Sequence, residues 1–581
     1  MNKNFLKLWA LALVAVLTFS ISCSDDVDPI IQIPSDFSEV KFDGEELTKT
    51  VKFNSNQEWS AAVMETRSSD VSWLSVSPKS GQAGDVTLTL TAEESFSLEE
   101  RTAYVYIIID GLSKSIEVKQ SAGILVVEDD AVEGVVSSKG FYVANEDWFG
   151  HDNGSVNLFE KNENSYDPQY RVYRAANDGA TLGVTTTYAK VWGDNAYFVS
   201  KQGKRLIVAD AKTLKNKANF EDLNGIGDGR GFVGVNDKKA YISGSSGIVV
   251  FDIETLSLDS KIEDVSGQIG NMVVSAGRVF AVSNNTLYVI DAETDEVEKT
   301  YAGSFNTLTV SKDGDVWVAS ANKLIQLDPV TLEQEEMDYP DGANINAAWG
   351  AWNASGLTAS TQTNTLYWTA GGTSWGGDKK VVKYDIDSKT ADTELFQLRN
   401  SSYGTATEFY GAGLRVDPLT DELVLTVRHS GWGDNYAYNW IHILDNNGTE
   451  KSHFELEGDN GTASDWQGDD AWGNKYYWFP AMPFFEDANK PQILINQILL
   501  KAGEEKVINL DEVVFDHDNS VASILKSVSF EESELATVSL DGNELTATAG
   551  EVAGKTVCTI SVVSNGVKVE KEVRLDITND K

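Results

Sequence analysis

A short phrase that recurs between Gly140 and Pro480 constrains the fold of this chain more than any other feature of its sequence. Each copy is an apolar run followed by Asp, two further residues and Thr. The clearest copies are IVADAKTL, VVFDIETL, YVIDAETD and IQLDPVTL, which place the motif at Asp210 and Thr213, Asp252 and Thr255, Asp291 and Thr294, and Asp328 and Thr331. Weaker copies follow at Asp385 and at Asp445 and Thr449, and one precedes them at Glu160. The copies lie about 40 to 60 residues apart, within or just beyond the spacing of propeller repeats.

Each repeat has the pattern of four short strands. The unit GFVGV, KKAYIS, GIVVFDIETL and SLDSKIE is typical, with alternating apolar residues between Gly, Asp and Asn turns. Four antiparallel strands repeated radially form a β-propeller, and counting from Glu160 to Asp445 gives seven blades. We expect the run Asn474–Ala481 to complete the first blade, because this closure removes exposed sheet edges. The repeated Asp and Thr then lie between the third and fourth strands, where we interpret them as turn formers rather than metal ligands.

The repeat also assigns every loop to one face of the ring. The turns on the hairpin face are short and polar, whereas the loops on the opposite face, here called the loop face, are long and rich in aromatic residues. The blades that carry these loops are neighbours in the ring, so we expect one continuous ligand-binding patch. Its expected members are Trp148, Phe149, His151, Trp349, Trp352, Trp375, Tyr403, Phe409, Tyr410, His429, Trp432, Tyr436, Tyr438, Trp466 and Trp472.

Packing is the alternative interpretation of these aromatic residues. Trp192, Trp317, Trp368 and Trp478 sit inside apolar strand runs, and we assign them to the core. The loop aromatics have Gly, Asp and Asn as neighbours, and some of them can still fold over their own loops. An exposed apolar cluster of this size usually marks a binding surface. The sequence therefore predicts a ligand or partner site on the loop face.

The N-terminus has the pattern of a secreted lipoprotein. Lys3 and Lys7 precede an apolar run from Leu8 to Phe19 that is too short for a stable membrane anchor. Cys23 ends this segment and resembles a lipidation site, although Ser20 replaces the usual Leu. The following Ser-Asp-Asp resembles the signal that sends Bacteroidetes lipoproteins to the outer face of the outer membrane. We therefore expect a signal peptide over 1–23, an export signal and linker over 24–36, and a lipid-anchored protein that faces the cell exterior; a periplasm-facing lipoprotein is the alternative.

The net charge argues against one class of partner, and the cysteine content argues against a cysteine nucleophile. The formal net charge is −42, which disfavours nucleic acid because phosphate binding needs clustered Lys and Arg. The only other cysteine, Cys558, lies in the alternating run KTVCTISVV, and we interpret it as a buried apolar residue rather than a nucleophile.

A separate β unit is expected over 37–122. Its runs NQEWSAAV, WLSVSPKSGQAGDVTLTLTAEES and RTAYVYIII closely resemble the BACON domain, an immunoglobulin-like module of Bacteroidetes surface proteins. The family name implies carbohydrate binding. Trp59 and Trp73, however, read as core or turn residues, and no aromatic platform is evident. We therefore favour a spacer that holds the propeller off the membrane.

The last unit, over 490–581, resembles a cadherin-like or immunoglobulin-like sandwich. Asp511, Asp516 and Asp518 are weak calcium candidates. Calcium needs six to eight oxygen ligands, and too few are evident, so we favour turn formation by these residues. The full expectation is thus an all-β chain: a seven-bladed β-propeller over 123–489 flanked by two immunoglobulin-like β-sandwich domains.

The sequence gives no sign of an enzyme. It contains no G-x-S-x-G, no H-E-x-x-H and no Cys–His metal cluster. Of the five histidines, His442 and His453 read as structural, whereas His151 and His429 fall in the expected loop-face segments. Carboxylates are plentiful there, but a glycosidase needs a pair at a set separation, which a sequence does not give. We expect a binding protein without catalytic residues or a required cofactor.

The ring resembles a known family. The opening GFYVANEDWFGHDNGSVNLFE, the Asp-x-x-Thr repeats and the closing YYWFPAMPFFED resemble surface lipoproteins of gut Bacteroidetes, over about Ile124 to Asp487. This family includes the cobalamin-binding propeller that sits over a TonB-dependent corrinoid transporter. The resemblance implies a corrinoid (cobalamin) ligand and that transporter as partner. A surface glycan-binding protein of a polysaccharide-utilisation system is the alternative, and a purely adhesive or scaffold protein is a third.

Overall fold

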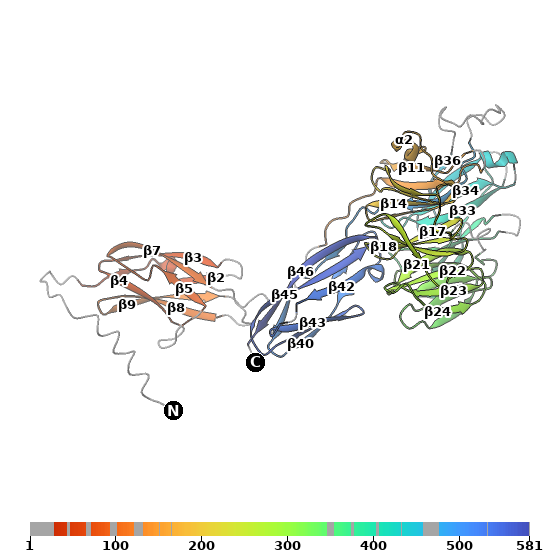
Figure 1. Cartoon of the computed structure of the whole chain (residues 1–581). Coiled ribbons are helices and arrows are strands. Elements are labelled where there is room, and N and C mark those ends of the chain that lie inside the picture. Colours follow the sequence, from red (N-terminus) through yellow and green to blue (C-terminus); the bar gives the residue numbers. More distant parts are fainter. Residues whose placement is uncertain are drawn as a thin grey trace. The chain divides into compact units, whose positions relative to one another are not determined.

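In the computed structural model the described residues are 28–42, 47–64, 71, 73–92, 101–120, 132–149, 152–163, 165–345, 354–372, 377–401, 406–431, 433–456, 476–531 and 533–579. They form an all-β structure with one short α-helix, α2 (Val172–Ala176). A compact unit spans Val127–Asp576, and the N-terminal domain belongs to a second unit (Figure 1). None of the described helices has the length and hydropathy that a membrane-spanning helix needs.

The N-terminal domain consists of two sheets around one core. The first pairs in the order β1-β3-β7-β5, with β1 (Ile31–Gln32), β3 (Thr48–Ser55), β7 (Gly84–Ala92) and β5 (Leu74–Ser77). The second pairs in the order β2-β9-β8-β4-β6, with β2 (Glu39–Phe42), β9 (Leu112–Gln120), β8 (Arg101–Ile109), β4 (Trp59–Met64) and β6 (Ser80–Gly81). The short 3-10 helix η1 (Ser35–Phe37) precedes β2. Trp59 and Trp73 are buried in the common core, as predicted, and Arg101 stacks on Trp73 at 4.6 Å.

Seven four-stranded antiparallel sheets follow within the described part of 140–485. The first sheet contains β10 (Gly140–Asn145), β11 (Ser155–Lys161) and β12 (Tyr166–Gln169), with β37 (Pro480–Phe485); the second contains β13 (Val184–Trp192), β14 (Asn195–Gln202), β15 (Leu206–Asp210) and β16 (Asn216–Phe220). The third contains β17 (Gly229–Gly234), β18 (Lys239–Gly244), β19 (Gly247–Asp252) and β20 (Ser257–Lys261); the fourth contains β21 (Ile269–Ser275), β22 (Arg278–Ser283), β23 (Thr286–Asp291) and β24 (Val297–Ala302); the fifth contains β25 (Phe305–Val310), β26 (Val316–Ser320), β27 (Lys323–Leu327) and β28 (Gln334–Asp338). The sixth contains β29 (Thr358–Ala359), β30 (Thr365–Ala370), β31 (Lys380–Asp385) and β32 (Thr390–Gln397), and the seventh contains β33 (Thr407–Val416), β34 (Leu423–His429), β35 (Asn439–Leu444) and β36 (Glu450–Glu455).

The sheets follow one another in a propeller-like arrangement. Each sheet packs on the next through its first strands, and β33 and β34 of the seventh pack on β37 of the first. The strand β37 pairs antiparallel with β10, with Phe141 opposite Phe485. Completion of the first sheet by a C-terminal strand is therefore confirmed. The pairing strand begins at Pro480, however, so most of the run expected to form it, from Asn474, precedes it.

The repeated Asp and Thr form the turns between third and fourth strands, as predicted. In the turn after β15, Asp210 Oδ1 accepts hydrogen bonds from the backbone N–H and the hydroxyl of Thr213, at 2.9 and 2.8 Å. The amide of Leu214 then donates to the carbonyl of Asp210, and Leu214 adopts a positive φ of 55°. Equivalent side-chain bonds to the turn backbone occur at Asp252, Asp291, Asp328, Asp385 and Asp445.

The tryptophans that the sequence assigned to the core are buried. Trp317, Trp368 and Trp478 are inaccessible to solvent, and Trp192 is nearly so. Trp317 of β26 and Trp368 of β30 share the core between the fifth and sixth sheets, and Trp368 Nε1 donates to the Ala343 carbonyl at 2.7 Å.

The C-terminal domain forms two further sheets and a short ribbon. The ribbon pairs β38 (Gln492–Ile493) with β41 (Val514–Phe515). One sheet has the order β39 (Gln497–Lys501), β46 (Val567–Thr578), β45 (Gly554–Ser564) and β42 (Leu525–Phe530). The other has the order β40 (Glu505–Asn509), β44 (Glu544–Ala549) and β43 (Ala536–Asp541). The 3-10 helices η5 (Leu510–Glu512) and η6 (Val521–Ser523) lie in its connections. Cys558 is fully buried in this domain, as expected, and burial raises the pKa of its thiol to about 11.

This domain packs on the hairpin face of the ring. The turn Asn565–Gly566 between β45 and β46 meets the turn after β13, where the Gly193 amide donates to the Asn565 carbonyl at 2.6 Å. The sequence had suggested only short polar turns on this face. These short turns also form the surface on which the C-terminal domain docks. At this surface, the Trp192 indole nitrogen donates to the Asn236 carbonyl of the neighbouring sheet at 2.8 Å.

Candidate functional site: the aromatic cluster of the loop face

Four consecutive aromatic residues ahead of β37 divide between two environments. Tyr476 and Trp478 point into the core between the first and seventh sheets, where Arg171 stacks on both rings at 4.4 and 4.9 Å. Tyr477 and Phe479 point the other way, into a separate group of side chains. This alternation places two aromatic rings at the loop face, where the ring of sheets closes.

The second group gathers aromatic residues from four segments. The Trp148 and Tyr477 ring centroids are 4.4 Å apart, and those of Tyr436 and Phe479 are 4.9 Å apart. Tyr410 lies 5.4 Å from Phe479. We call this group the aromatic cluster; its members are Trp148, Tyr410, Tyr436, Tyr438, Tyr477 and Phe479. Tilted and edge-on contacts at these separations are favourable, so the cluster holds its shape without a ligand.

A buried ion pair supports the cluster. Arg428 of β34 donates from Nε and Nη2 to Glu408 Oε1, at 3.0 and 2.7 Å. Its guanidinium lies 5.0 Å from the Tyr410 ring centroid and 5.5 Å from that of Tyr436. The Glu408 carboxylate is almost inaccessible, and its Oε2 accepts from the Gly377 amide at 2.8 Å. A cation beneath two phenol rings fixes their orientation.

Glu146 is a carboxyl beside the cluster whose pKa is raised. Burial raises the pKa of Glu146 to about 7, against the opposing effects of a hydrogen bond from Tyr410 and the charge of Arg428. Burial and the Glu146 charge in turn raise the pKa of the Tyr410 hydroxyl. Glu146 is thus a carboxyl beside Tyr410 whose pKa is raised by burial.

The loop that carries Trp148 is anchored by charged residues below it. Asp147 is almost fully buried at a positive φ of 54°, and burial raises its pKa to about 8. Arg174 of α2 lies 3.9 Å from Asp147 and donates to Asp152 Oδ1 at 3.0 Å. Tyr476 donates to Asp152 Oδ2 at 2.7 Å, which ties the loop to the segment that closes the ring.

The described part of the expected patch agrees only in part with the sequence assignment. Trp148, Tyr410, Tyr436 and Tyr438 belong to the aromatic cluster, and Phe149 is 57% exposed beside it in the chain. Several expected members lie outside the described residues: His151, Trp349, Trp352, Trp375, Tyr403, Trp432, Trp466 and Trp472. The same holds for the lipidation site Cys23.

Two expected members are buried strand residues outside the aromatic cluster. Phe409 lies in β33, opposite Val427, and is buried in the core of the seventh sheet. His429 ends β34 and is buried, with its Nδ1 2.5 Å from the Ser430 carbonyl. Both assignments to an exposed loop were wrong. The Gly-rich run around Gly411 resembles a loop, but it is a bulge inside β33 that passes close to the Ala481 carbonyl.

The sequence interpretation also missed residues. Tyr477, Phe479, Arg428 and Glu146 were not among the expected site residues, although the first two lie in the conspicuous run YYWF. Alternation along that run could have suggested that only Tyr476 and Trp478 share the core side.

The calcium candidates do not converge on one point. Asp511 pairs with Lys526 at 2.8 Å and accepts from Asn543 at 3.0 Å. The Asp518 amide donates to Asp516 Oδ1 at 2.7 Å, and the Asp518 carboxylate accepts from the Asn489 amide at 2.5 Å. In the part of the chain that the structure describes, no group of three acidic, His or Cys residues is placed to hold a metal ion.

A protein-family model matches most of the ring of sheets. Residues 139–486 match a family described as a domain of unknown function, DUF5074. The chain belongs to this family. Residues 34–122 match the viral BACON domain, in agreement with the resemblance noted in the sequence.

Comparison with individual proteins adds little. No curated protein matches the chain. Among solved structures, a quinoprotein alcohol dehydrogenase-like protein from Bacteroides thetaiotaomicron is 14% identical with a TM-score of 0.43, over 78% of this chain and 99% of that one. A GH5 xyloglucanase from Bacteroides ovatus, solved with a heptasaccharide, is 22% identical with a TM-score of 0.15. That match spans 19% of this chain and 22% of the xyloglucanase.

Proposed function

We propose that this chain is a cell-surface lipoprotein that binds a corrinoid on the loop face of a seven-bladed propeller and passes it to a TonB-dependent transporter. The observation that carries the proposal is the preformed aromatic cluster at the closure of the ring, with Phe149 exposed next to Trp148. The protein acts as a binding module, and it needs no catalytic residue or resident cofactor for this role.

The chemistry of the cluster suits a large, partly apolar disc. A corrin presents a flat ring system edged by amide-bearing arms. Packed aromatic side chains offer apolar area at a low entropic cost, because their rings are already held by their neighbours. The Arg428–Glu408 pair and Glu146 add polar groups beneath the rings. The resemblance of the opening and closing motifs to corrinoid-binding propellers supports the choice of ligand.

The other domains fit a protein held above a membrane. In this proposal Cys23 carries the lipid, the immunoglobulin-like BACON domain acts as a spacer, and the C-terminal immunoglobulin-like sandwich braces the hairpin face. The loop face then stays open for the ligand and the transporter.

Gel filtration tests the proposal directly. The soluble ectodomain, starting after Cys23, is incubated with cobalamin and separated from free ligand. Co-elution of the red chromophore with the protein is expected. A parallel incubation with soluble plant and host polysaccharides tests the glycan alternative by a mobility shift in affinity electrophoresis. Retention of a polysaccharide without any bound chromophore would replace the corrinoid proposal with the glycan one.

A further inference from the structure

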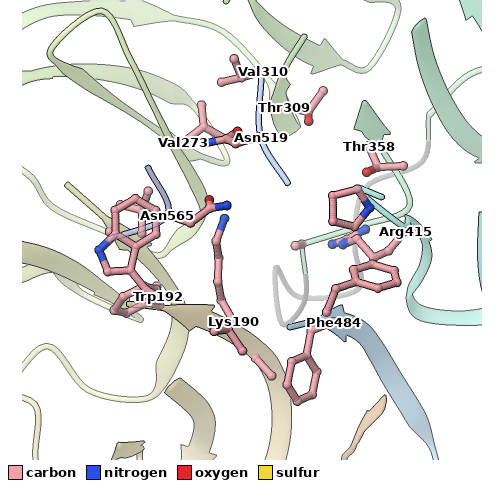
Figure 2. A pocket seen from close by; sticks show the side chains of 18 of the residues that line it. Lys190, Trp192, Val273, Thr309, Val310, Thr358, Arg415, Phe484, Asn519 and Asn565 are labelled. Atoms are coloured by element: carbon pink, nitrogen blue, oxygen red, sulfur yellow. The ribbon is translucent and has the colours of Figure 1, made fainter. Parts of the chain in front are cut away.

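The axis of the ring holds a cavity of about 320 Å³ (Figure 2). Its wall is formed by the C-terminal ends of the first strands β13, β17, β21, β25, β29 and β33, and by β37. Residues of the C-terminal domain, among them Asn519 and Asn565, line it as well. We call this space the central cavity. It lies toward the hairpin face and is separate from the aromatic cluster, with which it shares no residue.

Lys190 of β13 extends into the central cavity (Figure 2). Its Nζ lies 5.7 Å from the Trp192 ring centroid, and among the described residues it has no hydrogen-bond or ion-pair partner. Burial lowers the pKa of Lys190, and the charge of Arg415 lowers it further, whereas Asp487 opposes both. An ammonium group in such surroundings lacks a counter-charge at contact distance.

Arg415 of β33 reaches the same cavity from another sheet (Figure 2). Its Nη1 donates to the carbonyls of Ser355 and Leu414, at 3.0 and 2.6 Å. No described carboxylate pairs with its guanidinium, so the remaining N–H groups face the cavity without a protein acceptor. Burial lowers the pKa of Arg415 to about 10. Two cations thus share one cavity, and the charge of Arg415 disfavours the charged form of Lys190.

The acidic residues nearby do not neutralise this pair. Glu486 accepts from the Tyr142 hydroxyl at 3.1 Å, and the Asp518 carboxylate is held by Asn489. Asp487 accepts from Asn565 at 3.4 Å, and burial together with Asp516 and Asp518 raises its pKa. A carboxyl with a raised pKa carries less negative charge at neutral pH, so it is a weak counter-charge for Lys190.

We propose that the central cavity is an oxyanion-binding site, in which Lys190 and Arg415 hold a carboxylate or phosphate group. Guanidinium N–H groups and an ammonium suit the oxygens of either group, and charge-assisted hydrogen bonds of this kind are stronger than those between neutral groups. The volume exceeds that of inorganic phosphate and accommodates a small organic acid such as citrate. The apolar wall, which includes Met272 and Phe484, suits the carbon skeleton of such a ligand.

Isothermal titration of the full ectodomain with citrate and with inorganic phosphate, at constant ionic strength, tests the site. At least one of them is expected to bind the wild-type protein, and which one binds identifies the ligand chemistry. Lys190→Gln and Arg415→Gln are each expected to weaken that binding at least tenfold. Lys212→Gln is the matched control, because Lys212 is an exposed lysine on the turn after β15. It should bind like the wild type.

Absence of binding of both anions to the wild-type protein would overturn the proposal, and so would an equal loss in Lys212→Gln. If the cavity variants do not fold, crystals of the wild-type protein grown with selenate decide the question. An anomalous peak in contact with both Lys190 and Arg415 supports the site, and its absence refutes it. The site is independent of the proposed function, since Lys190→Gln should bind cobalamin as well as the wild type does.

Discussion

The Trp148 ring lies 4.4 Å from the Tyr477 ring and joins the first long loop of the ring to the segment that closes it. These residues are more than three hundred positions apart in the sequence, and they meet only because β37 pairs with β10. The aromatic cluster is therefore a product of ring closure. Any change that weakens the pairing of β37 should disturb the cluster as well.

The Asn565–Gly566 turn offers a test of domain docking. Gly566 has a φ of 82°, and an added Cβ would lie 2.5 Å from Trp192 Cδ1 and 2.8 Å from the Gly193 nitrogen. Gly566→Ala should therefore lower the free energy of unfolding by more than the ~1–2 kcal/mol of a left-handed alanine alone. Gly542→Ala is the control, because Gly542 also has a positive φ but nothing within 4 Å of the added Cβ. Calorimetric midpoints that fall equally in both variants would contradict close docking of the two domains.

Asp147 should make stability fall as the pH rises. Its folded pKa is raised to about 8 by burial, so the folded protein keeps a proton that the unfolded chain releases near pH 4. Its contribution is complete below pH 4 and is lost as the pH rises through 8, with a slope of up to about 1.4 kcal/mol per pH unit. Asp147→Asn should flatten the dependence of the thermal midpoint between pH 5 and 8, whereas Asn at the exposed Asp194 should not. Parallel curves for wild type and Asp147→Asn would exclude this linkage.

The Asp-x-x-Thr turns should stabilise the protein less at acid pH than at neutral pH. Hydrogen bonds from Thr213 lower the pKa of Asp210 to about 2, so its contribution is present above pH 4 and is lost as the pH falls toward 2. Because the side chain is exposed, we expect Asp210→Ala to cost only about 1 kcal/mol at pH 7. Asp259→Ala, at an exposed strand position, is expected to cost less. Urea unfolding at pH 7 and pH 3 measures both, and an Asp210→Ala penalty that is as large at pH 3 as at pH 7 would be inconsistent with this role.

The repeating part of the fold follows from local sequence signals. Alternating apolar runs and the side-chain bonds of residues such as Asp210 and Thr213 are short-range, so strand order within each sheet could be predicted. The same reasoning led to the wrong placement of Phe409. Gly411 looks like a loop residue, but it lies in a bulge of β33. This bulge passes close to Ala481, which is distant in the sequence.

The candidate site could be predicted only in outline. The assignment of each loop to one face of the ring placed Trp148 and Tyr436 on the same face. The contribution of Tyr477 depends instead on where the last strand begins. Phe479 adopts a positive φ of 47°, which breaks the run before β37. The central cavity had no sequence signal, because Lys190 reads as an ordinary strand residue until the C-terminal domain encloses it.

Cobalamin titration of the soluble ectodomain, followed by the absorbance of the corrin, tests the central claim most directly. Tyr436 contacts Tyr477, Phe479 and Arg428, so Tyr436→Ala removes the middle of the aromatic cluster. The control is Tyr301→Ala, a similarly half-buried tyrosine on β24, outside the cluster. We predict saturable binding to the wild type and to Tyr301→Ala, with at least tenfold weaker binding to Tyr436→Ala. No binding to the wild type, or equal affinity in a folded Tyr436→Ala, would contradict a corrinoid site on the aromatic cluster.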